Sequence, residues 1–331
     1  MTALKAGCIF QAVFFLVVAE SAATGKLGQL RKITVVSMGM TDTVIPQLRG
    51  LYDGLGEVGY VEGKNLNIDH LGHAGNEAQV RDLLKAMVRQ GTEVIVTPSS
   101  AEANLAKQVT SEVPIVFAPA VDPVGNGLVK SRANPGTNLT GLSYTRDVED
   151  NGKQLAVFKQ IVPGLRRVML FYDGRPVTRT SPAVLSSLER VARSLDIRLT
   201  QHAVNSSSEA LQILQRLPSG MIDGVFLVCS AVFRGMRPLS EMAASKRLPV
   251  FSCTASQVAE EGTLMTYTPD MYYLGYRGAW YVDRILKGAK PAQLRVETPM
   301  RFELVINISN ARRIGLVIPS EALMLADKVF H

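Results

Sequence analysis

Three glycines near the start of the chain, Gly54, Gly56 and Gly59, have the G-x-G-x-x-G spacing that binds the phosphates of a dinucleotide. That chemistry needs a strand before the glycines and a helix after them, because the phosphate contacts free N–H groups at the helix N-terminus. Here an amphipathic helical pattern precedes them, from Ile45 to Val58. Gly59 fits the left-handed position that ends many helices. The sequence therefore predicts a helix end followed by a turn, and no cofactor.

Small polar residues offer a second kind of chemistry, because they follow runs that read as strands. Hydroxyls beside free N–H groups at a helix N-terminus suit a carboxylate, and an aspartate suits a ligand amine. Each residue is equally well explained as a helix cap or a turn residue. Four scattered histidines support neither a catalytic triad nor a metal site. The candidates for ligand binding in these loops are Met40, Thr41, Ser99, Ser100, Asp122, Asp173 and Ser230.

The elements that position these loops alternate along the chain. Apolar, β-branched runs such as Lys32–Met38 are separated by helices with one apolar face. This β-α-β rhythm predicts an α/β fold with doubly wound parallel sheets. The rhythm restarts after Asn138–Tyr144, which favours two lobes. Ligands of such sheets bind at the carboxyl ends of the strands, where the polar loops lie.

The first 23 residues are typical of a signal peptide. Lys5 precedes the apolar run Cys8–Ala19, and small residues follow it. An uncleaved anchor is the alternative, although the run is shorter than the roughly 20 residues that span a bilayer. We expect residues 1–23 to be removed on export to the periplasm. Cys229 and Cys253 would then remain, as two buried thiols or, alternatively, as a disulfide.

The bulk composition favours a packed globular protein. The chain has 331 residues, of which 47% are hydrophobic and 20% charged. Its net charge of +7 comes from scattered Lys and Arg residues without a run of like charge. We therefore expect a basic surface and no nucleic-acid partner.

Three longer stretches make the sequence similar to a known family. The chain resembles the ABC-transporter substrate-binding proteins that include the tryptophan- and tyrosine-uptake binding proteins, over about Lys32 to Val329. The resemblance implies a type I periplasmic-binding fold that closes on its ligand by a hinge. It also implies a non-enzymatic monomer that hands an aromatic amino acid, or another small carboxylate or amide, to a permease and its ATPase. The stretches are YVEGKNLNI, VPIVFAPAVDPVGNGLVKSRANPGTNLTGLS and the block that begins YTPDMYYLGYRGAWYVDRILKG.

The resemblance also implies how the chain is divided. Three crossovers are expected near Leu142–Thr145, Thr266–Pro269 and Leu294–Pro299. Tyr144, Tyr267 and Asp270 at these crossovers join the candidates for ligand binding. The implied lobes are residues 30–143 with 268–293, and residues 144–267 with 294–331.

The sequence departs from the family pattern at loops that would touch the ligand. Ser99-Ser100 stands where members often carry Gly-Thr, and Asp173–Arg175 replaces a loop that contains Asn-Pro. The ligand therefore stays open. A ligand sensor that presents its closed form to a membrane receptor is the alternative function. An enzyme acting in the cleft ranks last, because the sequence offers no nucleophile with a base.

Overall fold

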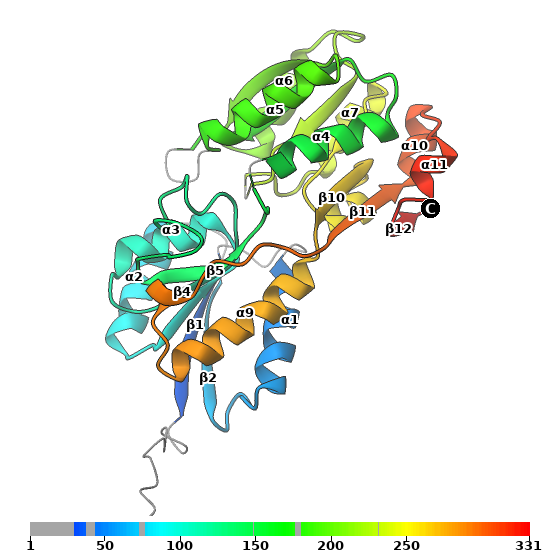
Figure 1. Cartoon of the computed structure of the whole chain (residues 1–331). Helices are drawn as coiled ribbons and strands as arrows, with labels where there is room; N and C mark the ends of the chain where they lie inside the picture. Colours follow the sequence, from blue (N-terminus) through cyan, green and yellow to red (C-terminus); the bar gives the residue numbers. More distant parts are fainter. Residues whose placement is uncertain (1–29, 38–43, 73–76, 148, 176–179, 231) are drawn as a thin grey trace, which may run out of the picture.

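The computed structural model describes residues 30–37, 44–72, 77–147, 149–175, 180–230 and 232–331. These residues form two α/β halves, each built on its own sheet (Figure 1). The expected signal peptide and the candidates Met40 and Thr41 lie outside them. No helix within the described ranges combines the length and the apolar character needed to cross a bilayer.

The first sheet contains five strands among the described residues, in the order β2-β1-β3-β4-β5, and every pairing is parallel. Helices α1 and α9 pack on one face, and α2 and α3 pack on the other. Burial on both faces explains the continuous apolar runs of these strands. The elements are β1 (Arg31–Ser37), α1 (Val44–Glu57), β2 (Leu66–Gly72), α2 (Glu77–Arg89), β3 (Val94–Thr97), α3 (Ser100–Val109), β4 (Ile115–Ala120), β5 (Leu139–Ser143), α9 (Met271–Leu286) and the 3-10 helix η1 (Pro291–Gln293).

The second sheet has the order β12-β11-β10-β9-β8-β6-β7 in the described part of the chain. Its pairings are parallel, except that β10 and β11 run antiparallel. Helices α4 and α5 cover one face, and α6 and α7 cover the other. The elements are α4 (Glu149–Ile161), β6 (Arg167–Asp173), α5 (Pro182–Ser194), β7 (Arg198–Val204), α6 (Ser207–Arg216), β8 (Gly224–Leu227), α7 (Arg237–Ser245), β9 (Val250–Phe251), α8 (Ala255–Ala259), β10 (Met265–Pro269), β11 (Phe302–Asn307), α10 (Ile308–Ile314), α11 (Ser320–Leu323) and β12 (Lys328–Phe330).

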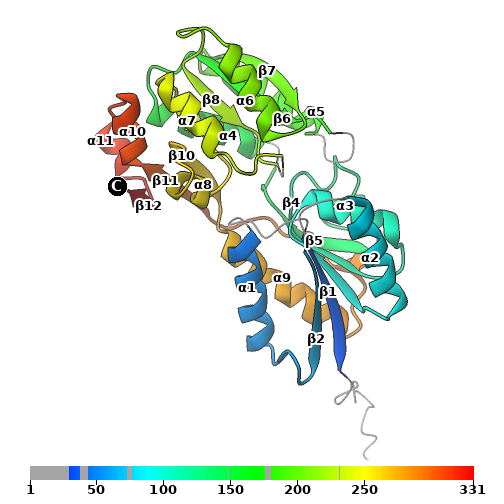
Figure 2. The same cartoon turned by 180° about the vertical axis from the view of Figure 1, so that it is seen from behind.

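The chain passes between the two halves after β5, between β10 and α9, and between η1 and β11 (Figures 1 and 2). Two positions differ from the ranges expected from the sequence. Pro269 still pairs with Phe302 in the second sheet, so the second sheet continues past residue 267. Glu297 forms a bridge with Leu142, so residues just after 294 remain attached to the first sheet. Backbone pairing at the crossovers causes both shifts, and residue patterns do not reveal such pairing.

The glycine-rich stretch ends a helix, as predicted. Helix α1 ends at Glu57, and Gly59 has a φ of +91°. Gly54 has a second role, because a Cβ there would lie 2.7 Å from the carbonyl oxygen of Tyr276 on α9. The turn leads into β2 at the amino end of that strand, and ligands of parallel sheets bind at the opposite edge.

Candidate ligand-binding site

A cavity of about 110 Å³ lies where the carboxyl ends of the two sheets face each other. A smaller one of about 60 Å³ adjoins it and shares Ser99, Ser100, Val121, Cys229 and Ser230. Both are lined by loops that leave β3, β4 and β8, together with helix N-termini. The position matches the binding edge predicted for parallel sheets.

The N-terminus of α3 forms the wall that belongs to the first sheet. Ser99 is its N-cap: the hydroxyl accepts from Ala101 N at 3.1 Å and donates to the carboxylate of Glu102. Ser100 Oγ accepts from Val121 N at 2.8 Å and donates to Val121 O at 3.2 Å. Both candidate serines therefore line the cavity, but their hydroxyls are bonded within this wall. Glu102 adds a buried carboxylate to it, in the helix turn where the macrodipole favours negative charge.

Asp122 and Tyr144 connect the two halves. Asp122 Oδ1 accepts from Gly125 N at 2.9 Å, and Oδ2 accepts from Ser181 Oγ at 2.6 Å. Ser181 precedes α5 at its N-cap position but makes no capping bond, because its hydroxyl reaches the first half instead. The Tyr144 backbone N donates to Ala120 O of the first sheet at 2.7 Å, and the Tyr144 hydroxyl donates to Cys253 O of the second half at 3.3 Å. Burial is the main cause that holds the pKa of Tyr144 well above its ordinary value, and the neighbouring thiols of Cys229 and Cys253 add to it. The phenol therefore stays protonated and remains a donor.

Loops after β8 and β9 form the opposite wall. They contribute Cys229, Ser230, Arg234 and Cys253, and Gln257 joins them from α8. Gln257 fixes the two loops together, since it donates to Phe233 O at 2.7 Å and accepts from Cys253 N at 2.9 Å. Burial, together with the neighbouring Cys229, raises the pKa of the Cys253 thiol. The two cysteines are free thiols at the cavity wall.

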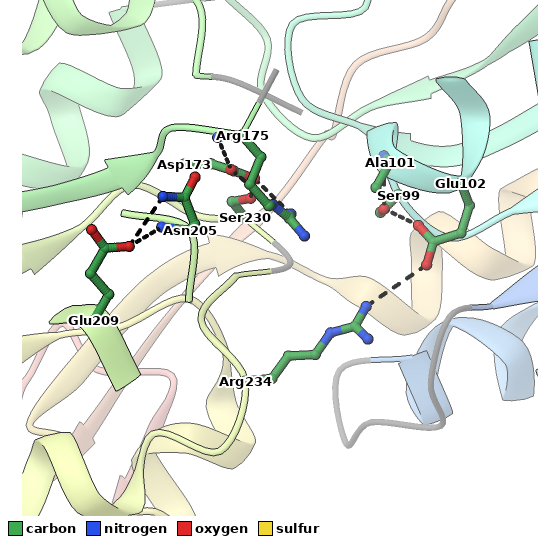
Figure 3. A network of polar contacts seen from close by, with 9 residues as sticks. All are labelled: Ser99, Ala101, Glu102, Asp173, Arg175, Asn205, Glu209, Ser230 and Arg234. Carbon is green, nitrogen blue, oxygen red and sulfur yellow. Dashed lines mark hydrogen bonds and ion pairs between the residues drawn. The ribbon is translucent and has the colours of Figure 1, made fainter. Parts of the chain in front are cut away.

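Asp173 belongs to a polar group behind this wall (Figure 3). Its carboxylate is fully buried at the end of β6 and accepts from Arg175 Nε at 3.0 Å and Nη2 at 2.8 Å. Ser230 also donates to it. Ser230 thus faces the cavity while its hydroxyl is bonded to Asp173, and Asp173 supports the loop from behind.

Tyr267 and Asp270 lie elsewhere. Tyr267 is in β10, where its ring packs on Phe302 with centroids 5.3 Å apart. Asp270 is the N-cap of α9 and accepts from Tyr273 N at 3.0 Å. Neither residue lines the cavity. The structure therefore brings together Ser99, Ser100, Tyr144 and Ser230, places Asp122 and Asp173 next to them, and leaves Tyr267 and Asp270 apart.

The most important residues missed by the sequence interpretation are Glu102 and Arg234. They approach to 3.8 Å from opposite walls of the cavity (Figure 3). Glu102 could have been noticed from the sequence, because Ser99 and Glu102 have the Ser-x-x-Glu spacing of a capping box. Arg234 follows an apolar strand in a loop, and that position alone does not distinguish it from a surface arginine. Gln47 and Met271, at the starts of α1 and α9, also line the cavity.

Metal ligation finds no support in the described ranges, where no group of three or more His, Cys, Asp and Glu side chains is arranged to hold an ion. The cavity offers one buried carboxylate, one guanidinium, fixed hydroxyls and apolar surface.

Comparison with known proteins places this architecture. A model of the family described as ABC transporter substrate binding protein matches residues 32–330. A tyrosine-binding protein from Clostridioides difficile is 25% identical over 260 residues, which are 78% of this chain and 73% of that protein. A conserved domain protein from Vibrio cholerae has a structure with a TM-score of 0.81 at 29% identity, covering 91% of this chain and 100% of that one.

A further solved structure, an ABC domain from Streptococcus pneumoniae in complex with L-Trp, has a TM-score of 0.83 at 24% identity. It covers 91% of this chain and 100% of that one. The fold is that of the type I periplasmic binding proteins. The chain belongs to the ABC transporter substrate binding protein family, whose members are extracytoplasmic, bind small molecules for ABC transporters and are not enzymes.

Proposed function

We propose that this protein captures an amino acid, with an aromatic one as the leading candidate, and delivers it to the permease and ATPase of an ABC importer. The observation that carries the proposal is the cavity between the facing carboxyl edges of two sheets, with polar contacts reaching across it. Such an arrangement suits hinge closure around a small ligand. The tyrosine-binding relative and the L-Trp complex support the choice of ligand.

The proposal includes a division into lobes and a location. Lobe 1 comprises residues 30–143 with 270–297, and lobe 2 comprises residues 144–269 with 298–331, which follows the strand pairing at the crossovers. Export through the signal peptide at residues 1–23 would place a monomer in the periplasm, where it meets the permease.

A thermal-shift screen of the mature chain tests the ligand. The protein is unfolded and refolded to remove bound solutes, and then heated with each of the twenty amino acids and a set of small carboxylates. A ligand at 100 times its Kd adds about 2.7 kcal/mol to the free energy of unfolding. For a chain of this size that raises Tm by about 4 °C. If tryptophan, tyrosine and phenylalanine all leave Tm unchanged, the aromatic assignment is wrong.

A pair of variants tests whether binding occurs in this cavity. Ser230→Trp places an indole in the cavity wall and should abolish the ligand-induced shift. Ser245→Trp adds the same side chain at an exposed position on α7 and should leave the shift unchanged. An intact shift in Ser230→Trp would place the ligand elsewhere.

A further inference from the structure

Glu102 and Arg234 give the cavity two opposite charges on opposite walls. Glu102 Oε1 and Arg234 Nη2 lie 3.8 Å apart, with side chains that are 1% and 34% exposed. Glu102 belongs to α3 on the first sheet, and Arg234 belongs to the loop between β8 and α7 on the second (Figure 3). The separation exceeds that of a hydrogen bond, so this ion pair is a long one.

The neighbouring acid–arginine pair shows what a closed ion pair looks like in the same region. Arg175 donates two side-chain hydrogen bonds to Asp173, at 3.0 and 2.8 Å. Asp173 ends β6 and Arg175 lies two residues later, so their geometry does not depend on how the two halves approach each other. The Glu102–Arg234 pair differs on both points, because it is longer and depends on how the halves approach each other.

The wall at α3 is suited to a cationic group. The Ser100 hydroxyl is engaged with the backbone of Val121, and the Ser99 hydroxyl with Ala101 N and Glu102. A ligand carboxylate placed here would meet the buried carboxylate of Glu102, and like charges in a buried site repel strongly. An anion at the α3 serines, which the sequence suggested, is therefore disfavoured, whereas an ammonium group would gain a charged partner.

The wall at Arg234 is suited to an anion. The Arg234 loop is held in place, since Ser207 Oγ donates to Arg234 O at 2.8 Å and Gln257 Nε2 donates to Phe233 O at 2.7 Å. A guanidinium on such a fixed loop presents a planar set of donors that matches a carboxylate.

We propose that Glu102 and Arg234 select a zwitterion, with the α-ammonium of an amino acid on Glu102 and its α-carboxylate on Arg234. This inference rests on the proposed function, in that the ligand is taken to be an amino acid. The zwitterion replaces one long ion pair by two charge-assisted ones and leaves the buried charge balanced. A ligand with only one of the two charges separates the pair but compensates only one of its two charges, which costs binding free energy where a charge is buried, as on Glu102. Each end of the ligand attracts a different half, so binding and closure are coupled.

Calorimetric titration with three matched probes tests the assignment. L-tryptophan has both charges, 3-indolepropionate lacks the ammonium, and tryptamine lacks the carboxylate. For the wild type, each truncated probe should bind about 10- to 100-fold more weakly than L-tryptophan. Glu102→Gln should lose about that factor for L-tryptophan and little for 3-indolepropionate. Arg234→Gln should lose about that factor for L-tryptophan and 3-indolepropionate, which carry a carboxylate, and little for tryptamine.

A matched ion pair on the surface supplies the control. Arg193 and Glu189 lie 3.9 Å apart on α5, with side chains 72% and 47% exposed. Glu189→Gln and Arg193→Gln should leave all three affinities unchanged. Thermal unfolding of each variant shows whether it folds, and Arg234→Gln keeps the test available if Glu102→Gln is unstable, because Arg234 is partly exposed.

Repeating the titrations with L-leucine, 4-methylpentanoate and isoamylamine separates the two proposals. If the wild type binds L-leucine with the same charge dependence and binds none of L-tryptophan, L-tyrosine and L-phenylalanine, the aromatic assignment fails and the zwitterion inference stands. If 3-indolepropionate binds as tightly as L-tryptophan, or if both variants bind L-tryptophan like the wild type, the inference is overturned while the aromatic assignment survives. Failure of the refolded wild type to bind any of L-tryptophan, L-tyrosine, L-phenylalanine and L-leucine overturns both.

Discussion

The contact between α1 and α9 and the cavity between the two sheets are built on opposite principles. At the helix contact, a Cβ on Gly275 would lie 1.8 Å from the carbonyl oxygen of Gln47, and one on Gly50 would lie 2.0 Å from that of Tyr272. The backbones touch, and no methyl group fits. The cavity instead encloses about 110 Å³ between side chains from both halves. Figure 2 shows α1 and α9 side by side below the level of the second sheet.

The difference has a structural use, because the same two helices serve both regions. Gln47 on α1 and Met271 on α9 line the cavity, and Gly275 lies one helical turn beyond Met271 against the backbone of Gln47. Close backbone packing therefore fixes the position of side chains that line the cavity. Recognition can then vary through side chains without loss of the scaffold.

Gly275→Ala is expected to produce the largest effect. The added methyl group collides with backbone, which cannot rotate away as a side chain could, so we expect a loss of about 3 kcal/mol or more in the free energy of unfolding. For a chain of this size the corresponding fall in Tm is about 5 °C. Chemical denaturation followed by far-UV circular dichroism measures the change.

Gly56→Ala is the matched control. Gly56 lies in α1 with nothing within 4 Å of its Cβ position. Alanine is the better helix former there, so the variant should gain about 0.5 kcal/mol. If Gly275→Ala is as stable as the wild type, the close helix contact is not a feature of the folded protein.

Ser181→Ala tests a contact that belongs to the cavity side of the comparison. The Ser181–Asp122 hydrogen bond of 2.6 Å joins the two halves, so the proposed hinge opening would break it. Removing it should weaken ligand binding about fivefold, since hydrogen bonds to charged groups are among the stronger ones. Titration of the ligand found in the thermal-shift screen measures the change.

Ser206→Ala separates closure from helix capping. Ser206 Oγ accepts from Glu209 N at 3.1 Å and caps α6 without reaching the first half. Its loss should cost about 1 kcal/mol in stability and leave affinity unchanged. Equal affinity losses in both variants would mean that the Ser181 contact has no specific part in closure.

This pair of serines also shows how far the sequence could be interpreted. Both immediately precede helices, where serine is a typical cap, but only Ser206 makes the capping bond. Local patterns correctly predicted the helix end at Gly59, the alternation of strands and helices, and the edge of the sheets where the cavity lies. Those features depend on local backbone geometry and on burial. The spacing of apolar residues and the positions of glycine and proline in the sequence indicate both.

What the sequence could not predict depends on contacts between distant segments. Glu102 reads locally as part of a capping box, and only the approach of Arg234 from the other half shows that it faces a cavity. Tyr267 sits at a crossover, yet the antiparallel pairing of β10 with β11 places its ring on Phe302 rather than in the cavity. One-dimensional patterns contain no information about which loops of two separate sheets face each other.

The two thiols provide a smaller effect on the cavity side. Ligand in the cavity should slow alkylation of Cys229 and Cys253 by iodoacetamide about threefold, because both line it.

The alkylation rate of Cys253 should also depend on pH. Burial and the nearby Cys229 raise the pKa of Cys253, so its reactive thiolate forms only above the usual thiol range. The alkylation rate should therefore keep rising with pH in that range. Mass spectrometry of the two tryptic peptides follows each site. A disulfide between them in the purified protein, visible as a loss of two mass units, would contradict the free-thiol state.

Asp150 gives the smallest expected effect and concerns the first crossover. Burial alone would raise its pKa, but hydrogen bonds from the Arg146 side chain and backbone and from Lys153 outweigh burial, so the pKa lies below its usual 3.8. A carboxylate with a lowered folded pKa stabilises the protein above its unfolded pKa, and this contribution disappears as pH falls through the folded value. Arg146 lies just after Tyr144, so the bonds between Arg146 and Asp150 orient the segment that enters the cavity.

Because the pKa of Asp150 is lowered in the folded protein, Asp150→Asn should lower Tm most at pH 7. The difference in Tm from the wild type should shrink as the buffer is taken below pH 3.8. A difference that stays constant over that range would show that the amide perturbs packing instead of removing a charge.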